Sequence, residues 1–139
     1  MRGLAVLVGA LIGASVGGSV VTAGVTAGAQ SEPYSGGADY QVYCSSCHGA
    51  SGKGDGSIAK SLKKHPADLT QLAKLNNGVF PGDKVYNTVD GRASGSRHSD
   101  SDMPAWGDVF AKSSESQGAE NAALRIRTLV KYLGTLQVM

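Results

Sequence analysis

The residues best suited to chemistry lie in the stretch CSSCH, Cys44 to His48. Cys44 and Cys47 are the only two cysteines of the chain, and His48 directly follows the second one. Three kinds of site use such a spacing: a dithiol that cycles through a disulfide, one half of a structural zinc site, and the attachment point of a covalently bound haem. The rest of the sequence has to distinguish between them.

Zinc and redox sites both lack their usual companions. A structural zinc takes four ligands, usually from two Cys-x-x-Cys pairs or from one such pair and a spaced His pair. The other two histidines, His65 and His98, lie far from the cysteines and from each other. A thioredoxin-like dithiol follows a strand, but no strand pattern precedes Cys44. A disulfide between adjacent turns of one helix would be strained. These interpretations stay open but are disfavoured.

A covalent haem uses all three residues in this order. Each thiol adds to one vinyl group of the porphyrin, and the imidazole of His48 supplies a ligand to the iron. Met103, followed by Pro104 in a loop between helical patterns, is the best candidate for the opposite ligand. Its neutral, soft thioether favours the reduced iron. His98 and His65 are weaker candidates, and the alternative role for Met103 is core packing.

The N-terminal region predicts export. Met1 to Ala29 carries one charge, Arg2, followed by an apolar stretch that ends in Ala27-Gly28-Ala29, a pattern that signal peptidase cleaves. We therefore expect a secretory signal over 1–29, a flexible mature N-terminus over 30–37 and one domain over 38–139. The expected location is the periplasm, which favours the haem interpretation because c-type attachment takes place outside the cytoplasm.

The alternative for the N-terminal region is an uncleaved membrane anchor. Leu4 to Val25 contains no charge, and about 20 apolar residues suffice to span a bilayer. However, Gly, Ala, Ser and Val dominate this stretch, and no cluster of Lys or Arg would fix its orientation. We expect membrane association only if this segment is retained.

Composition excludes one class of partner and suggests a cofactor. The chain has 13 basic and 11 acidic side chains, which is not the strongly basic balance of a nucleic-acid-binding protein. With two Phe and one Trp, the hydrophobic core is expected to be lean for a domain of this size. A large buried cofactor would compensate for this shortage.

The periodicity predicts an all-α domain with three to five short helices joined by Gly-rich loops. A helical face over 36–48 carries Tyr40, Tyr43 and both thiols, with Asp39 near its N-cap, and a Gly-rich loop follows. A short element stops at Pro66. Further helices are expected from Asp68 or Thr70 to Asn77-Gly78, from near Pro81 to Gly91, and after Pro104.

The last predicted helix, 119–136, has the most regular pattern. Its apolar stripe consists of Ala122, Ile126, Leu129, Val130, Leu133 and Leu136. Arg125, Thr128 and Lys131 are expected on its other sides. We expect this stripe to pack against the helix that carries Tyr40 and Tyr43.

Several segments together resemble the class I cytochromes c, in particular the small bacterial periplasmic ones. They are CSSCHGASGKGDG, HPADLT, FPGDKVYNTVDGR, MPAWGDVF and ALRIRTLVKYLGTLQ, and the resemblance covers roughly residues 38–136. It implies the cytochrome c fold, with the helices wrapped around one covalent haem c. Cys44 and Cys47 match the thioether positions, His48 the proximal iron ligand and Met103 the distal one.

The resemblance implies a monomeric electron carrier rather than an enzyme. It would transfer one electron at a time between exported or membrane redox proteins, without nucleic acid. The alternative is a cytochrome subunit of a periplasmic dehydrogenase or oxidase. A haem peroxidase or a sensor in which a gas displaces Met103 ranks lower, because no second catalytic cluster is visible.

Other residues have weaker expected roles near the haem. The carbonyl of Pro66 is a candidate partner for the His48 ring. Trp106, Arg92 and Arg97 are candidates for the haem edge or its propionates. Four lysines precede Pro66: Lys53, Lys60, Lys63 and Lys64. They would either attract an acidic partner protein or form an ordinary solvated surface.

Overall fold

The computed structural model describes residues 33–92, 102–113 and 118–138. These residues contain no strand, which confirms the predicted all-α class. Their α-helices are α1 (Gly36–Tyr43), α2 (Ser45–His48), α3 (Gly82–Asp90), α4 (Trp106–Lys112) and α5 (Ala119–Thr135). In the three described segments, no helix has the length and apolar character needed to cross a membrane. The predicted signal over 1–29, as well as Arg97 and His98, lies outside the described residues.

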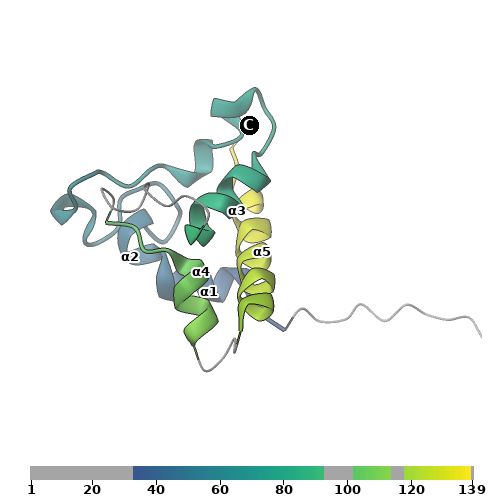
Figure 1. Ribbon diagram of the computed structural model, residues 1–139. Coiled ribbons are helices and arrows are strands. Elements are labelled where there is room, and N and C mark those ends of the chain that lie inside the picture. Colours follow the sequence, from purple (N-terminus) through teal and green to yellow (C-terminus); the bar gives the residue numbers. More distant parts are fainter. Residues whose placement is uncertain (1–32, 93–101, 114–117, 139) are drawn as a thin grey trace, which may run out of the picture. The chain divides into compact units, whose positions relative to one another are not determined.

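Helix α5 packs against three other helices, α1, α3 and α4 (Figure 1). Its apolar stripe is buried as predicted, since Ala122, Ile126 and Leu129 have no exposed surface. From the other helices, Tyr40, Val85, Val89 and Phe110 complete the core around this stripe. The expected contact between the first and last helices is therefore confirmed.

The crossing of α1 and α5 depends on a glycine. The backbone of Gly36 lies directly against the backbone of Thr128, so a Cβ atom at Gly36 would collide with the Thr128 carbonyl oxygen. The next residue, Gly37, faces only the ring of Tyr132, whose nearest carbon lies 3.3 Å from a Cβ built there. Two adjacent glycines thus differ in what surrounds them.

We expect Gly36→Ala to destabilise the protein by about 1–3 kcal/mol, because the helices would have to separate to accommodate the methyl group. Gly37→Ala is the matched control, since a Tyr132 side chain can yield and alanine gains up to about 1 kcal/mol of helix propensity over glycine. Urea unfolding of both variants measures the difference. Equal stability of the two variants would contradict the close backbone contact.

The helix predicted over 36–48 is broken at Cys44. Helix α1 ends at Tyr43, and Cys44 has φ −118° and ψ −33° before α2 begins. The hydroxyl of Ser45 donates to the carbonyl oxygen of Gln41, four residues earlier, at 2.6 Å. Such back-bonding often bends a helix. Cys44 therefore lies at the junction between α1 and α2, as the C-cap of one and the N-cap of the other, and Cys47 lies within α2.

The segment predicted as a helix from Asp68 to Asn77 forms two 3-10 turns, Leu69–Gln71 and Lys74–Asn76. Its predicted cap is correct, because the carboxylate of Asp68 accepts from the Thr70 amide at 2.9 Å. Its backbone bonds instead to the end of the chain: Gln137 accepts from the Ala73 amide and donates to the Leu69 carbonyl, both at 2.8 Å. These tertiary bonds replace those that a regular α-helix would make.

Helix α3 agrees with its prediction at both ends. Pro81 precedes its first residue, and Gly91 ends it with a left-handed φ of 70°. This conformation suits glycine because it has no Cβ atom. Val85 and Val89 are buried on the face predicted for them.

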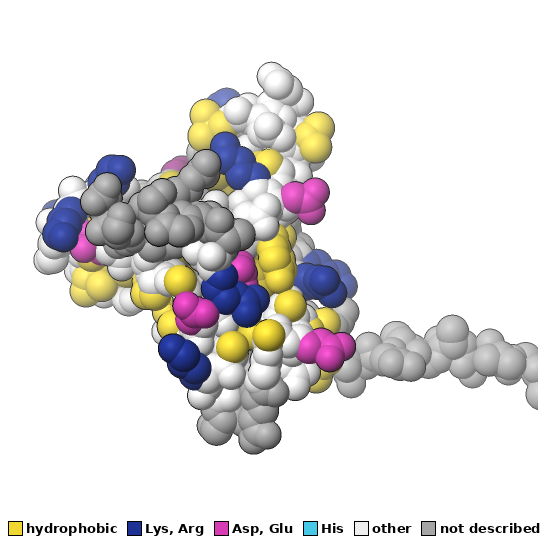
Figure 2. Space-filling model, in the orientation of Figure 1, with side chains coloured by type: hydrophobic (Ala, Val, Ile, Leu, Met, Phe, Trp, Pro, Cys, Tyr) yellow, Lys and Arg dark blue, Asp and Glu magenta, His cyan; other side chains and the backbone are white. Residues whose placement is uncertain are grey.

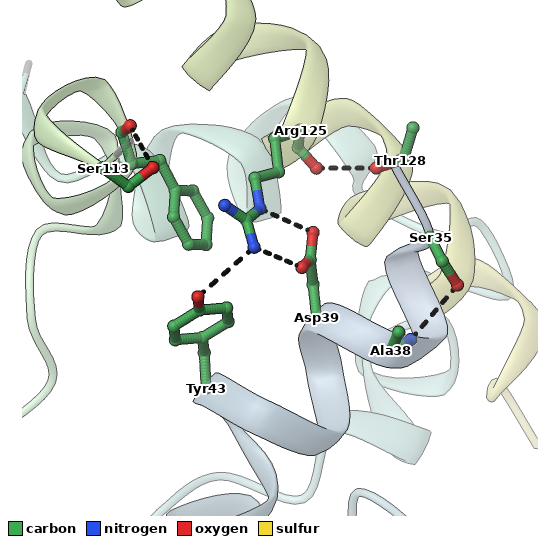
Figure 3. Close-up of polar contacts among 8 residues, drawn as sticks. Ser35, Ala38, Asp39, Tyr43, Ser113, Arg125 and Thr128 are labelled. Carbon is green, nitrogen blue, oxygen red and sulfur yellow. Dashed lines mark hydrogen bonds and ion pairs between the residues drawn. The ribbon is translucent and has the colours of Figure 1, made fainter. Parts of the chain in front are cut away.

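Arg125 and Thr128 are buried, although the pattern placed them away from the core. Arg125 is 3% exposed and Thr128 8%. Arg125 donates through Nε and Nη2 to the two carboxylate oxygens of Asp39, at 2.9 and 2.7 Å (Figure 3). Asp39 lies in the first turn of α1, near the N-cap Ser35. The apolar pattern of α5 does not predict the burial of Arg125, because a charged side chain is buried only when it has a partner, and the partner lies on another helix.

Candidate functional site

A cavity of about 430 Å³ brings the predicted site residues together. Cys44, Cys47, His48 and Met103 all line it, although Met103 is far from the others in the sequence. The volume lies within the range of roughly 300–1,000 Å³ that is typical of ligand and cofactor pockets. The structure thus places all four predicted residues at one site.

The remaining lining is mostly apolar and comes from nearly every element. It includes Tyr40 and Tyr43 from α1, Val85 and Val89 from α3, Leu129 and Leu133 from α5, and Leu62, Leu69 and Leu72 from the intervening segment. The apolar stripe of α5 therefore contributes to both the core and the cavity lining. The helical periodicity of α5 predicted that Leu129 and Leu133 are buried, but it did not indicate that they line a cavity.

The ring of His48 is oriented by a backbone carbonyl. Its Nδ1 atom lies 3.0 Å from the carbonyl oxygen of Ala67. A carbonyl can only accept a hydrogen bond, so Nδ1 carries the proton and Nε2 keeps a free lone pair. The predicted partner, the Pro66 carbonyl, lies instead 2.9 Å from Nδ1 of His65. The prediction was wrong by one residue.

Burial keeps His48 in the form that binds a metal. Removal from solvent lowers the pKa of His48, and the hydrogen bond to the Ala67 carbonyl opposes this effect only in part. The imidazole is therefore neutral at neutral pH. A metal-binding histidine must be neutral, and it usually donates its second ring N–H to an oxygen acceptor.

The first cysteine is unsuited to redox exchange. Cys44 and Cys47 are free thiols. Burial, followed by the nearby charges of Asp39 and Cys47, raises the pKa of the Cys44 thiol to about 12. Thiols that exchange disulfides have a lowered pKa, because the thiolate is the reactive form. The environment of Cys44 therefore favours the neutral thiol over the thiolate that disulfide exchange requires.

The glycine-rich segment after His48 is a loop, as predicted, and it folds back onto the cysteine motif. The amides of Gly54 and Gly56 donate to the carbonyls of His48 and Cys47, at 2.8 and 3.1 Å. Gly54 has a φ of 82°, and its Cα lies so close to Pro66 that a Cβ atom would reach within 2.5 Å of the Pro66 carbonyl oxygen. The loop thus fixes the motif against the segment that orients His48.

Met103 lies in the loop before α4, partly buried against the core. Trp106 follows it at the start of α4 and packs on Tyr43 and Phe110, with ring centroids 5.4 and 5.7 Å away. Trp106 also lines the cavity, so it serves the core and the site together. His65, the weaker candidate for the opposite ligand, lines the cavity as well but is exposed.

The donor set at the cavity fits a haem. It offers two thiols for thioether bonds, one neutral imidazole and one thioether, which are the groups that hold a His/Met-ligated c-type haem. Among the described residues, no group of three or more His, Cys, Asp and Glu is arranged to hold a metal ion. A haem iron needs no such group, because the porphyrin supplies four of its ligands.

The charged residues considered in the sequence are distributed over the surface. Lys53, Lys60, Lys63 and Lys64 are all exposed. Arg92 is paired with Asp90 at 2.7 Å. On the face drawn in Figure 2, Lys and Arg side chains are interspersed with Asp and Glu and do not form one large patch.

Comparison with known proteins identifies no family for this chain. No protein-family model, no curated protein and no solved structure matches it.

Proposed function

We propose that this protein is a c-type cytochrome that carries single electrons. The observation that carries the proposal is that Met103 lines the same cavity as Cys44, Cys47 and His48. The family resemblance of the sequence, which implies the cytochrome c fold around one haem c, supports the same assignment. A bound haem would supply the one-electron chemistry of its iron.

The residues of the chain would hold and tune this group. Cys44, at the junction of α1 and α2, and Cys47, within α2, would tether it covalently. His48, oriented by the Ala67 carbonyl at 3.0 Å, would provide one nitrogen ligand to the iron. Met103 would supply a neutral thioether, a ligand that raises the reduction potential. The apolar lining excludes water and keeps the polarity of the site low.

Ligation by both His48 and Met103 would favour a carrier over an enzyme. Catalysis at iron requires a vacant or easily displaced position, and these two ligands together would leave none. Electrons would then pass through the exposed edge of the group to exported or membrane redox proteins, through small transient contacts. The proposed location is the periplasm, and the protein is proposed to act as a monomer.

The second candidate is a cytochrome subunit of a periplasmic dehydrogenase or oxidase. The apolar side chains of Leu75, which lines the cavity, and Val79 are 81% and 65% exposed and would suit a larger partner, which favours this candidate. Co-purification with a catalytic subunit from the native membrane or periplasm distinguishes the two. A protein recovered alone, which accepts and donates electrons reversibly, supports the carrier.

The variant Met103→Ala tests the axial assignment. We expect it to lose the far-red absorption band of a methionine–ferric-iron bond and to bind added imidazole tightly. Its reduction potential should fall, within the roughly 0.8 V range that axial ligands control. The exposed Val109→Ala in α4 is the control and should keep the band. A wild-type protein without this band would contradict ligation by Met103.

A further inference from the structure

One short segment, 62–67, contacts both sides of the cavity. At its end, the Ala67 carbonyl orients His48. At its start, the backbone amide of Lys63 donates to a carboxylate oxygen of Asp102 at 2.6 Å. Asp102 directly precedes Met103 in the sequence. The segment that fixes the proximal side is therefore also bonded to the loop that carries the distal candidate.

The contact between Lys63 and Asp102 is specific in its chemistry. The donor is a backbone N–H and the acceptor is a carboxylate oxygen, a combination that gives short hydrogen bonds. Both Asp102 and Lys63 are exposed, whereas Met103 is partly buried. Asp102 also lines the cavity. The bond thus joins two exposed residues, one of which directly precedes the predicted iron ligand Met103.

We propose that Asp102 is a positioning residue that holds the Met103 loop against the cavity and keeps the sixth iron position closed. This inference rests on the proposed function. Without the bond to the Lys63 amide, the loop would open more often and leave the position free for a small ligand. Asp102 itself would not touch the iron.

The size of the effect follows from competition between Met103 and an added ligand. The apparent affinity of a ligand that binds only the open form is reduced by the fraction of open molecules. A solvent-exposed hydrogen bond contributes only modestly to stability. Its removal should therefore raise the open fraction, and the affinity for the added ligand, by about threefold to tenfold.

The experiment measures imidazole binding to the oxidised, haem-loaded protein by absorption. Asp102→Ala should bind imidazole about threefold to tenfold more tightly than the wild type, and its far-red methionine band should weaken. Asp102→Asn should bind imidazole less tightly than Asp102→Ala and stay closer to the wild type, because an amide oxygen can accept the same hydrogen bond without the charge. Asp83→Ala removes an exposed carboxylate from α3 and should change neither the imidazole affinity nor the far-red band.

The possible failures are distinguishable. If Met103→Ala increases imidazole affinity but Asp102→Ala does not, the positioning role is refuted while the axial assignment stands. If Asp102→Asn behaves like Asp102→Ala, the hydrogen bond is not the cause and the inference is also overturned. If the wild type carries no covalent haem, the proposed function fails and this inference fails with it.

Discussion

Replacing both cysteines, Cys44→Ala with Cys47→Ala, is expected to abolish covalent haem attachment completely. The two thiols line the same cavity as His48, and no other cysteine exists in the chain to replace them. Exported protein from cells that assemble c-type cytochromes should then lose its red colour, and its intact mass should equal that of the polypeptide alone. Each single variant should retain one thioether bond.

The neighbouring serine provides the matched control. Ser46 lies between the cysteines and is exposed, so Ser46→Ala should carry haem at the wild-type level. Extraction with acidified acetone separates covalent from loosely bound haem. Haem that resists extraction in the double variant would contradict the assignment of the two thiols.

Breaking the buried pair of Arg125 and Asp39 is expected to have the largest effect on stability. Arg125 is 3% exposed, and its guanidinium lies 4.5 Å from the centroid of the Phe110 ring. The hydrogen bonds to Asp39, above all, raise the pKa of Arg125, so the guanidinium remains charged. Arg125→Met leaves the Asp39 carboxylate buried without its partner, which typically costs about 3–5 kcal/mol.

Urea unfolding of the haem-loaded protein measures this loss. Arg127→Met, on the exposed side of the same helix, is the control and should change stability by less than about 0.5 kcal/mol. The double variant Asp39→Asn with Arg125→Met should be less destabilised than the sum of the single variants, because it buries no unpaired charge. A strictly additive result would show that the two side chains do not act as a pair.

The sequence predicted those parts of the structure that depend on local pattern. The stripe of α5 and the boundaries of α3 were correct because residue spacing and a glycine stop determine them. The four candidate site residues were chosen from the sequence because their chemistry and order are distinctive. They line one cavity.

The features that the sequence missed depend on contacts between distant segments. Nothing near Arg125 indicates that Asp39 pairs with it, and no local feature shows that Gln137 bonds to the segment around Ala73 and prevents an α-helix there. The predicted hydrogen-bond acceptor for the His48 ring was the carbonyl of Pro66 instead of that of Ala67. The backbone conformation of the loop decides which carbonyl reaches the ring, and the sequence does not specify it to within one residue. No pattern in the sequence predicts the hydrogen bond from the Lys63 amide to Asp102.

The most direct test of the central claim is the intact mass of the exported wild-type protein, combined with a pyridine haemochrome spectrum. The protein should have the mass of the polypeptide after removal of residues 1–29 plus one haem, and the spectrum of a haem joined by two thioether bonds. A polypeptide mass without haem, with both thiols free to react with an alkylating reagent, would contradict covalent haem attachment.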